Sequence, residues 1–392
     1  MAVVINGTTG IDKVQDGSIQ TADLAANAVT TAKIANTVNL GRRNLIINGA
    51  MQVAQRGTSF TVSNDNWLYL MDRFQFDENG ASGAVLDITQ STDAPDGFSY
   101  SLKVDVSTAD AALASGDGLR IQHKIEAQNL QHLGHGTSSA KPVTLSFWVK
   151  SNTTGTNTIW VYKQDSSSQT SFAYTVNAAD TWEYKTITIP ADTSGAIDNN
   201  NDQGMMISWY LAAGTDFNSG TLASSWESLT NANRAPGQVN NFSSTSNYWA
   251  ITGVQLEVGD TATPFEHRSY AEELLACQRY YWDTNSDRYN DNYIGAWKYN
   301  TSWYWEIFLP VEMRTIPTAT YTYNTNYIIW SGSGNTTYTD AANSLTLRPG
   351  TNHLRVYTGG TTRGSPAEAG MITLGNAGGS TSRQQYYLDA EL

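Results

Sequence analysis

The sequence has a single cysteine and few charged residues, and each shortage excludes a class of protein. Cys277 has no partner within the chain, so no intrachain disulfide forms. Charged residues are 15% of the total, below the ~25% that is usual in globular proteins. The 23 Lys and Arg residues form no basic block among 36 Asp and Glu, which argues against a nucleic-acid partner.

Long apolar runs are also missing. No stretch reaches the roughly 18 residues that a membrane-spanning helix needs, so we expect no membrane insertion. The start MAVVINGTTG lacks a charged region followed by an apolar run, so we expect no secretory signal and assembly in a cytoplasm. The chain is instead rich in Trp, Tyr, Gly, Ser, Thr and Asn, arranged around short apolar runs. This composition predicts an all-β protein.

Residues 16–35 consist of two copies of a ten-residue unit, DGSIQTADLA and ANAVTTAKIA. Two such polar units cannot bury a core, because stacked repeats need about three or more copies. We therefore interpret residues 1–43 as the attachment and stalk segment of a homotrimer, in which symmetry copies supply the missing core. The predicted trimer contacts are Ile19, Leu24, Val29 and Ile34. A disordered linker is the alternative interpretation.

Strand patterns dominate residues 44–268, which predict an antiparallel β-sandwich or jelly roll. The run PVTLSFWVKS at 142–151 alternates apolar residues with polar ones and Trp148. The run GMMISWYLAAG at 204–214 is continuously apolar, which is typical of a strand buried on both faces. Loops rich in Gly and Asn separate such runs, as in sandwiches and jelly rolls.

Residues 269–282, SYAEELLACQRYYW, predict one linking helix that begins with an S-x-x-E capping box at Ser269. One stripe of this helix holds Tyr270, Leu274, Cys277 and Tyr281. Cys277 is interpreted as a small buried hydrophobe, since the sequence places no base beside it. Residues 283–392 contain further strand patterns and predict a smaller C-terminal β-sandwich.

Three blocks carry a more specific pattern: RRNLIINGAMQVAQRGTSF (42–60) followed by MDRF (71–74), IEAQNLQHLGHGTSSAKPVTLSFWVKS (125–151), and WAITGVQLEVGDTATPFEHRSYAEELLACQRYYW (249–282). Together they resemble a widespread family of bacteriophage and prophage tail-fibre proteins. The family resemblance predicts Trp after Asp-Arg, whereas this chain has Phe74 at that position. The resemblance implies a phage-tail virion protein, a homotrimeric fibre, a jelly roll similar to carbohydrate-binding modules, and recognition of a host surface glycan.

Aromatic residues crowd the C-terminal region, and the flat faces of sugars pack on Trp and Tyr rings. The predicted carbohydrate-binding residues of this receptor-binding tip are Trp297, Tyr299, Trp303, Trp305, Tyr327 and Trp330. A three-residue hairpin loop puts the first four on one face, whereas a two-residue loop separates the first two from the next two. Alternation leaves at most about half of the aromatics at the surface, and the others are core or trimer-interface anchors.

Metal sites and catalytic motifs have weaker support. One segment holds a cluster of possible zinc ligands: His123, Glu126, His132 and His135. Their spacing matches no common zinc site, so surface or loop histidines are the simpler interpretation. The run DNNND at 198–202 offers oxygen ligands for calcium, without EF-hand spacing, and a solvated loop is simpler. There is no G-x-S-x-G motif.

We therefore expect a non-catalytic protein without cofactors, in which three weak sugar sites on one fibre give avidity. Its expected partners are two further copies of itself, another tail or baseplate protein bound through residues 1–43, and a host polysaccharide or lipopolysaccharide. One alternative is a purely structural tail fibre or collar. The other is a glycan-hydrolysing tailspike, because paired carboxylates are a three-dimensional property that the sequence leaves open.

Overall fold

The chain divides into two units, Met1–Arg42 and Arg43–Leu392. The computed structural model describes residues 42–63, 67–80, 82–283, 293–299, 302–322, 326–331, 334–339, 345–358, 369–373 and 385–392. The predicted stalk contacts Ile19, Leu24, Val29 and Ile34 lie outside these described residues.

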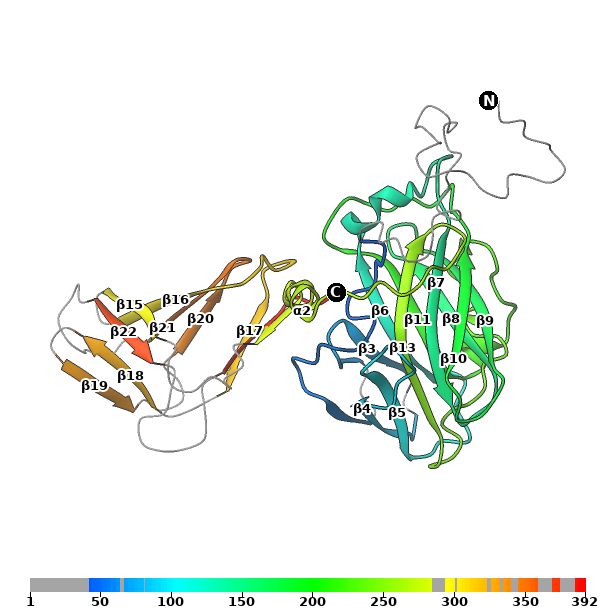
Figure 1. The fold of residues 1–392 in the computed structure, drawn as a ribbon, viewed down its shortest axis with the longest axis horizontal. Helices are drawn as coiled ribbons and strands as arrows, with labels where there is room; N and C mark the ends of the chain where they lie inside the picture. The colour runs from blue at the N-terminus through cyan, green and yellow to red at the C-terminus, as the bar shows by residue number, and fades with distance from the viewer. Residues whose placement is uncertain are drawn as a thin grey trace, which may run out of the picture. The chain divides into compact units, whose positions relative to one another are not determined.

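Two antiparallel sheets make up a jelly-roll sandwich (Figure 1). The six-stranded sheet consists, in spatial order, of β1 (Ser59–Ser63), β4 (Val85–Ser91), β5 (Ser101–Thr108), β13 (Tyr248–Val258), β7 (Val143–Ser151) and β10 (Glu183–Ile189). The seven-stranded sheet consists of β12 (Glu227–Ser228), β9 (Ser168–Val176), β8 (Gly155–Lys163), β11 (Gln203–Ala213), β6 (Gly118–Glu126), β3 (Phe74–Asn79) and β2 (Trp67–Tyr69). Neighbouring strands in space are mostly distant in sequence, as a jelly roll requires.

Two more antiparallel sheets follow in the C-terminal region. A three-stranded sheet holds β14 (Tyr281–Asp283), β23 (Gln385–Asp389) and β17 (Thr318–Thr322). A second seven-stranded sheet, here called the distal sheet, holds β19 (Gly334–Thr339), β18 (Asn326–Ser331), β22 (Ala369–Thr373), β15 (Tyr293–Tyr299), β16 (Ser302–Phe308), β21 (His353–Thr358) and β20 (Leu345–Pro349). The predicted all-β, antiparallel fold class is confirmed.

Helices are few among the described residues. They are the α-helices α1 (Thr215–Asn218) and α2 (Tyr270–Gln278) and the 3-10 helices η3 (Ala127–Leu133) and η4 (Asn231–Asn233). None of the helices in the described ranges is long and apolar enough to cross a bilayer.

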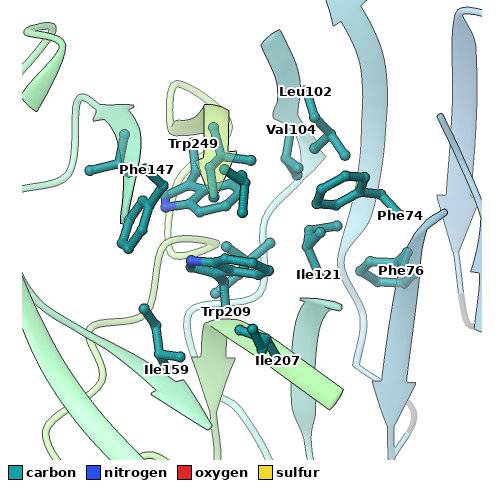
Figure 2. Close-up of a cluster of buried hydrophobic side chains, with 14 of the residues drawn as sticks. Phe74, Phe76, Leu102, Val104, Ile121, Phe147, Ile159, Ile207, Trp209 and Trp249 are labelled. Carbon is teal, nitrogen blue, oxygen red and sulfur yellow. The ribbon is translucent and has the colours of Figure 1, made fainter. Parts of the chain in front are cut away.

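The two sheets of the jelly roll enclose one apolar core. Along β7 the alternate positions are fully buried, as the sequence pattern predicts: Val143, Leu145, Phe147 and Val149. Figure 2 shows part of this core, where Trp209 of β11 and Trp249 of β13 lie among aliphatic and aromatic side chains. The ring of Phe147 meets that of Trp209 edge-on, with the ring centroids 5.9 Å apart. Such a pair stabilises the core by about 0.5–1.5 kcal/mol beyond its buried area.

Helix α2 begins as predicted and ends earlier. The Ser269 hydroxyl accepts a hydrogen bond from the Glu272 backbone N–H, and the Glu272 carboxylate accepts one from the Ser269 N–H, which completes the capping box. The predicted end at residue 282 is wrong, because Tyr281–Asp283 pairs with β23 as strand β14. Strand pairing with a segment far along the chain overrides the local helical pattern there.

The predicted apolar stripe of α2 is only partly correct. Cys277 is fully buried, as predicted. Tyr270, however, is 57% exposed, and Glu273 is buried on the inner side of the helix instead. The Glu273 carboxylate accepts a hydrogen bond from the Asn48 backbone N–H and faces Arg268, so a satisfied carboxylate occupies a position that periodicity alone assigns to an apolar residue.

Candidate functional site

One side of the seven-stranded sheet of the jelly roll faces away from the sandwich core, and we call it the outer face. Strand β6 shows how the sequence builds it. Leu119 and Ile121 belong to the core, whereas Arg120, Gln122 and Lys124 alternate with them on the outer face. Successive side chains of a strand point to opposite sides of the sheet, so this polar alternation gives a hydrogen-bonding surface.

The register of β2, β3 and β6 aligns the outer-face residues in two rows. The first row holds Tyr69, Gln75 and Gln122, and the second holds Trp67, Asp77 and Arg120. Directly opposite positions of an antiparallel ladder lie about 4.5–5.5 Å apart, so each row is a continuous band of side chains.

Hydrogen bonds fix the orientation of the polar groups in these rows. The Asp77 carboxylate lies 2.9 Å from Arg120 Nη2 and accepts a 2.9 Å hydrogen bond from Gln122 Nε2. The second arm of the guanidinium, Arg120 Nη1, donates to Asn79 Oδ1 at 2.6 Å. The planar groups are therefore held in place before any ligand arrives, which lowers the entropic cost of binding.

All residues of these two rows except Gln122 lie in one wall of a cleft of about 1110 Å³, which we call the outer-face cleft. The first wall comprises Trp67, Tyr69, Gln75, Asp77, Glu78, Asn79, Gly80, Arg120 and Lys124. The opposite wall comprises Tyr281, Arg314, Thr315, Ile316, Thr318, Thr320, Tyr387, Asp389, Ala390, Glu391 and Leu392. Trp67 is 67% exposed on the edge strand, so its ring is available to a ligand.

The opposite wall is held to the jelly roll by two arginines stacked on consecutive tyrosines. The guanidinium of Arg56 lies 3.6 Å from the Tyr281 ring centroid, and that of Arg73 lies 3.5 Å from the Tyr280 ring centroid. Both arginines pair with Glu391, whose side chain is 4% exposed. Burial by itself lowers the pKa of Arg73, but the charge of Glu391 together with the nearby Tyr280, Tyr69 and Cys277 outweighs burial and raises that pKa above its usual range.

The end of the described chain is also anchored on the first wall. The backbone carbonyl oxygen of Leu392 accepts hydrogen bonds of 2.7 Å from the Tyr69 hydroxyl and from Lys124 Nζ. Burial raises the pKa of Tyr69, and the nearby Glu391 raises it further. The Tyr69 hydroxyl therefore remains a hydrogen-bond donor over the whole ordinary pH range.

Two large aromatic residues of the outer face, Trp160 and Tyr210, are covered. Trp160 is 4% exposed and Tyr210 is fully buried, and the Arg234 guanidinium lies 4.2 Å from the Trp160 ring centroid. The Trp160 indole N–H donates to Gln169 Oε1 at 3.0 Å. These rings stabilise the fold, whereas Trp67 on the edge strand β2 is 67% exposed.

The predicted carbohydrate-binding aromatics lie on described strands of the distal sheet, although their side chains lie outside the described part of the structure. Tyr299 pairs with Ser302, so the hairpin has the two-residue connection. Paired positions share a face, and the register divides the six predicted residues into two sets. Positions 297, 299 and 330 fall on one face, and positions 303, 305 and 327 fall on the other.

Burial distinguishes these two faces of the distal sheet. Position 305 pairs with Val356, and both Val356 and Leu354 on that side are fully buried. The other side carries the Glu306–Arg355 ion pair, and the Arg355 side chain is 44% exposed. The register therefore places positions 297, 299 and 330 on the side of the ion pair, and we call these three positions the surface set of the distal sheet.

The histidine cluster does not come together. His123 is buried in the core, where its Nε2 lies 3.2 Å from the Ile47 carbonyl oxygen, so its interpretation as a surface or loop histidine is wrong. Burial lowers its pKa well below the usual value. Glu126 pairs with Arg279 at 2.9 Å, and His135 Nε2 lies 3.0 Å from the Lys141 carbonyl oxygen. Within the described ranges, no group of three or more His, Cys, Asp or Glu is placed to hold a metal ion.

The outer-face cleft is missed by the sequence reasoning, which concentrates on the distal aromatics. The usable signal is the run GLRIQHKIE at 118–126, in which Arg120, Gln122 and Lys124 alternate with apolar residues and His123. Such alternation marks a face directed away from the core. It does not say that β23 and the 314–320 segment form a second wall.

No protein-family model matches the chain, and no curated protein matches it. Among solved structures, it is similar to the enzymatically active domain of tailspike protein 4 of bacteriophage CBA120, with 13% identity over 55% of this chain and 21% of that chain, and a TM-score of 0.29. The match thus spans about a fifth of the tailspike chain. A family 11 carbohydrate-binding module of a Clostridium thermocellum cellulosomal cellulase gives 12% identity over 54% of this chain and 98% of that chain, with a TM-score of 0.27.

A family 61 carbohydrate-binding module in complex with β-1,4-galactotriose gives 8% identity over 55% of this chain and 99% of that chain, with a TM-score of 0.27. Likeness at these identities and TM-scores carries no argument about function. Support for a function therefore comes from the residues of the outer-face cleft and from the sequence blocks.

Proposed function

We propose that this protein binds a surface glycan in the outer-face cleft without cleaving it, as a trimeric tail-fibre component that attaches a bacteriophage to its host. The observation that carries glycan binding is the exposed ring of Trp67 beside the fixed row of Asp77 and Arg120. An aromatic ring packs on the C–H face of a pyranose, and planar polar groups fix its hydroxyls. The volume of about 1110 Å³ is slightly above the ~300–1,000 Å³ of drug-sized sites, which suits an oligosaccharide.

The charges in the cleft favour binding over hydrolysis. Asp77 is paired with Arg120, and Glu391 is paired with Arg56 and Arg73. A glycosidase needs one carboxyl that gives a proton and a second that attacks or activates water. Both carboxylates are held by guanidinium groups, and this pairing favours a binding role for the cleft.

The phage assignment rests on the blocks at 42–60, 125–151 and 249–282, which resemble tail-fibre proteins. In that role residues 1–43 begin the threefold stalk and bind another tail or baseplate protein. The mass of the purified protein in solution tests the stalk, and a stable monomer contradicts it. A trimer presents three clefts, so weak single-site binding gives strong attachment to a repetitive polysaccharide.

The direct test is binding of purified host polysaccharide and lipopolysaccharide fractions by the full chain and by a Trp67→Ala variant. We expect Trp67→Ala to weaken single-site affinity by about tenfold or more, as truncation of a central aromatic contact does. Tyr184→Ala is the matched control, because Tyr184 is a 44% exposed aromatic on the other sheet of the jelly roll. This control should bind like the parent protein.

Two further measurements separate the alternatives. Trp330→Ala tests the surface set of the distal sheet, and loss of binding in this variant but not in Trp67→Ala moves the site to the distal sheet. Release of new reducing ends from a bound polysaccharide would establish a hydrolase instead. Failure of the parent protein to bind any host envelope fraction refutes the attachment role and leaves a structural fibre.

A further inference from the structure

A small pocket lies at the other edge of the jelly roll's seven-stranded sheet. The outer-face cleft is at the β2 and β3 end of the strand order, whereas this pocket is at the β12 and β9 end, and the two share no residue. We call it the edge pocket. Its volume of about 390 Å³ falls within the ~300–1,000 Å³ of small-molecule sites. Its walls are the 166–168 turn, the 192–195 segment and β12 with the preceding Trp226.

A buried ion pair makes the base of the edge pocket rigid. The Lys163 side chain is fully buried, and its Nζ donates to Asp192 Oδ2 at 2.5 Å and to the Gly195 carbonyl oxygen at 2.6 Å. The other carboxylate oxygen of Asp192 accepts from the Ser194 N–H, the Ser194 hydroxyl and the Gly195 N–H. Burial alone raises the pKa of Asp192, but these hydrogen bonds outweigh burial and lower it below its usual value.

Gly195 is required by the close approach of these groups. A Cβ at this position would lie 2.5 Å from Asp192 Oδ2 and 2.7 Å from Lys163 Nζ. Any side chain here would therefore separate the ion pair. The 192–195 segment is thus preorganised, and Asp192 and Lys163 are committed to each other rather than to a ligand.

An indole ring and hydroxyl groups form much of the remaining surface. The Trp226 indole N–H donates to the Pro190 carbonyl oxygen at 2.7 Å, which holds the ring in place. Lys163 Nζ lies 4.4 Å from the ring centroid, within cation–π range. Ser166, Ser194 and Ser228 add hydroxyls that both donate and accept.

Glu227 supplies the one carboxylate with spare hydrogen-bonding capacity. Its Oε1 accepts from Gln169 Nε2 at 2.9 Å and from Asn233 Nδ2 at 3.0 Å. Its Oε2 accepts no hydrogen bond from the residues that the structure describes. A carboxylate oxygen on a pocket wall is a strong acceptor for ligand hydroxyls.

We propose that the edge pocket binds a single neutral sugar residue, or a polyol of similar size, independently of the outer-face cleft. The ring of Trp226 takes the C–H face of the sugar, and Glu227 and the serines take its hydroxyls. An anionic ligand would meet two carboxylates and no uncommitted cation among the lining residues. A calcium ion needs about 6–8 oxygen ligands, and only Glu227 offers an uncommitted carboxylate oxygen.

The experiment is saturation-transfer NMR on the full chain with neutral hexoses and, separately, a uronic acid at millimolar concentrations, together with a calcium titration. Glu227→Gln is the informative variant, because glutamine keeps Oε1 for Gln169 and Asn233 and replaces the free acceptor with a donor. We expect at least one neutral hexose to bind, and Glu227→Gln to weaken it about tenfold. Trp226→Ala should abolish transfer, whereas Trp67→Ala should leave it unchanged.

Each outcome decides the proposal separately from the outer-face cleft. Binding of a hexose that is lost in Glu227→Gln and kept in Trp67→Ala supports the edge pocket, whether or not the cleft binds polysaccharide. Absence of transfer from every hexose, equal transfer in Glu227→Gln, or saturable calcium binding that Glu227→Gln removes would each overturn it. A loss that occurs only in Trp67→Ala assigns the sugar to the cleft and overturns the edge pocket.

Discussion

The ion pairs of Glu391 with Arg56 and Arg73 predict that the Glu391→Gln substitution releases the C-terminal strand from the jelly roll. The Glu391 side chain is 4% exposed and that of Arg73 is 1% exposed, so no water compensates for the lost charge. Arg56 keeps Asp389 at 3.1 Å, but Asp389 is 44% exposed. Removing one partner of a buried ion pair destabilises a protein by about 3–5 kcal/mol. We expect Glu391→Gln to destabilise the attachment of the C-terminal strand by about 3 kcal/mol, because glutamine retains one carbonyl acceptor.

The loss should appear as local opening before global unfolding, because the pairs join β23 to the jelly roll and are not part of the sandwich core. A cost of about 3 kcal/mol raises the open population roughly a hundredfold. Hydrogen exchange measures this at the backbone N–H of Ala390, which donates to the Tyr280 carbonyl oxygen at 2.8 Å. Because β23 contributes to the second wall of the outer-face cleft, glycan affinity should fall in parallel.

Asp105→Asn is the matched control, since it breaks the Lys103–Asp105 pair, whose side chains are 27% and 41% exposed. Exposed pairs contribute about 0–1 kcal/mol, so exchange at Ala390 should stay at the parent rate. Equal exchange rates at Ala390 in Glu391→Gln and Asp105→Asn would refute the reasoning. The double variant Arg73→Met with Glu391→Leu should recover part of the loss, because it removes both charges of the Arg73–Glu391 pair and leaves Arg56 paired with Asp389.

Three further predictions concern the rest of the jelly roll. Burial by itself raises the pKa of Glu183, but hydrogen bonds from Lys185 and the 177–178 turn outweigh burial and lower the pKa to about 2. The folding stability that this lowered pKa gives is present above the usual pKa of 4.5 and is lost as the pH falls toward 2, so Glu183→Gln should flatten acid denaturation curves over this pH window. Gly253 has φ +61°, and a Cβ there would lie 2.7 Å from Phe98 Cζ. Gly253→Ala should therefore lower the free energy of unfolding by about 1–3 kcal/mol in urea titrations, and an unchanged urea midpoint would contradict this prediction. Cys277 is fully buried and burial raises its pKa, so thiol reagents should modify it only as fast as the protein unfolds.

Local signals account for the elements that the sequence predicts correctly. The alternation in 142–151 follows from the two-residue period of a strand, and its apolar set is fully buried in β7. The continuous run at 204–214 is buried on both faces in β11, with all but Gln203 buried. The capping box at Ser269 needs only the residue three positions later.

The errors arise where distant segments meet. The local pattern extends α2 to residue 282, but residues 281–283 pair with β23 and form a strand. His123 occupies an inward position of β6 because its neighbours fix the register, although its residue type suggests the surface. A two-residue rather than three-residue hairpin divides the distal aromatics between two faces, and composition does not distinguish these cases.

The fold class, the alternation that separates core from outer face, and the start of α2 can all be predicted from the sequence, since each depends on residues within a few positions of one another. The locations of the cleft and the edge pocket depend instead on contacts between segments far apart in the chain. Arg73 and Glu391 meet across 318 positions, and Lys163 meets Asp192 across 29. Such pairs depend on strand order and register, which arise from the packing of the whole sandwich and leave no signal in a short stretch of sequence.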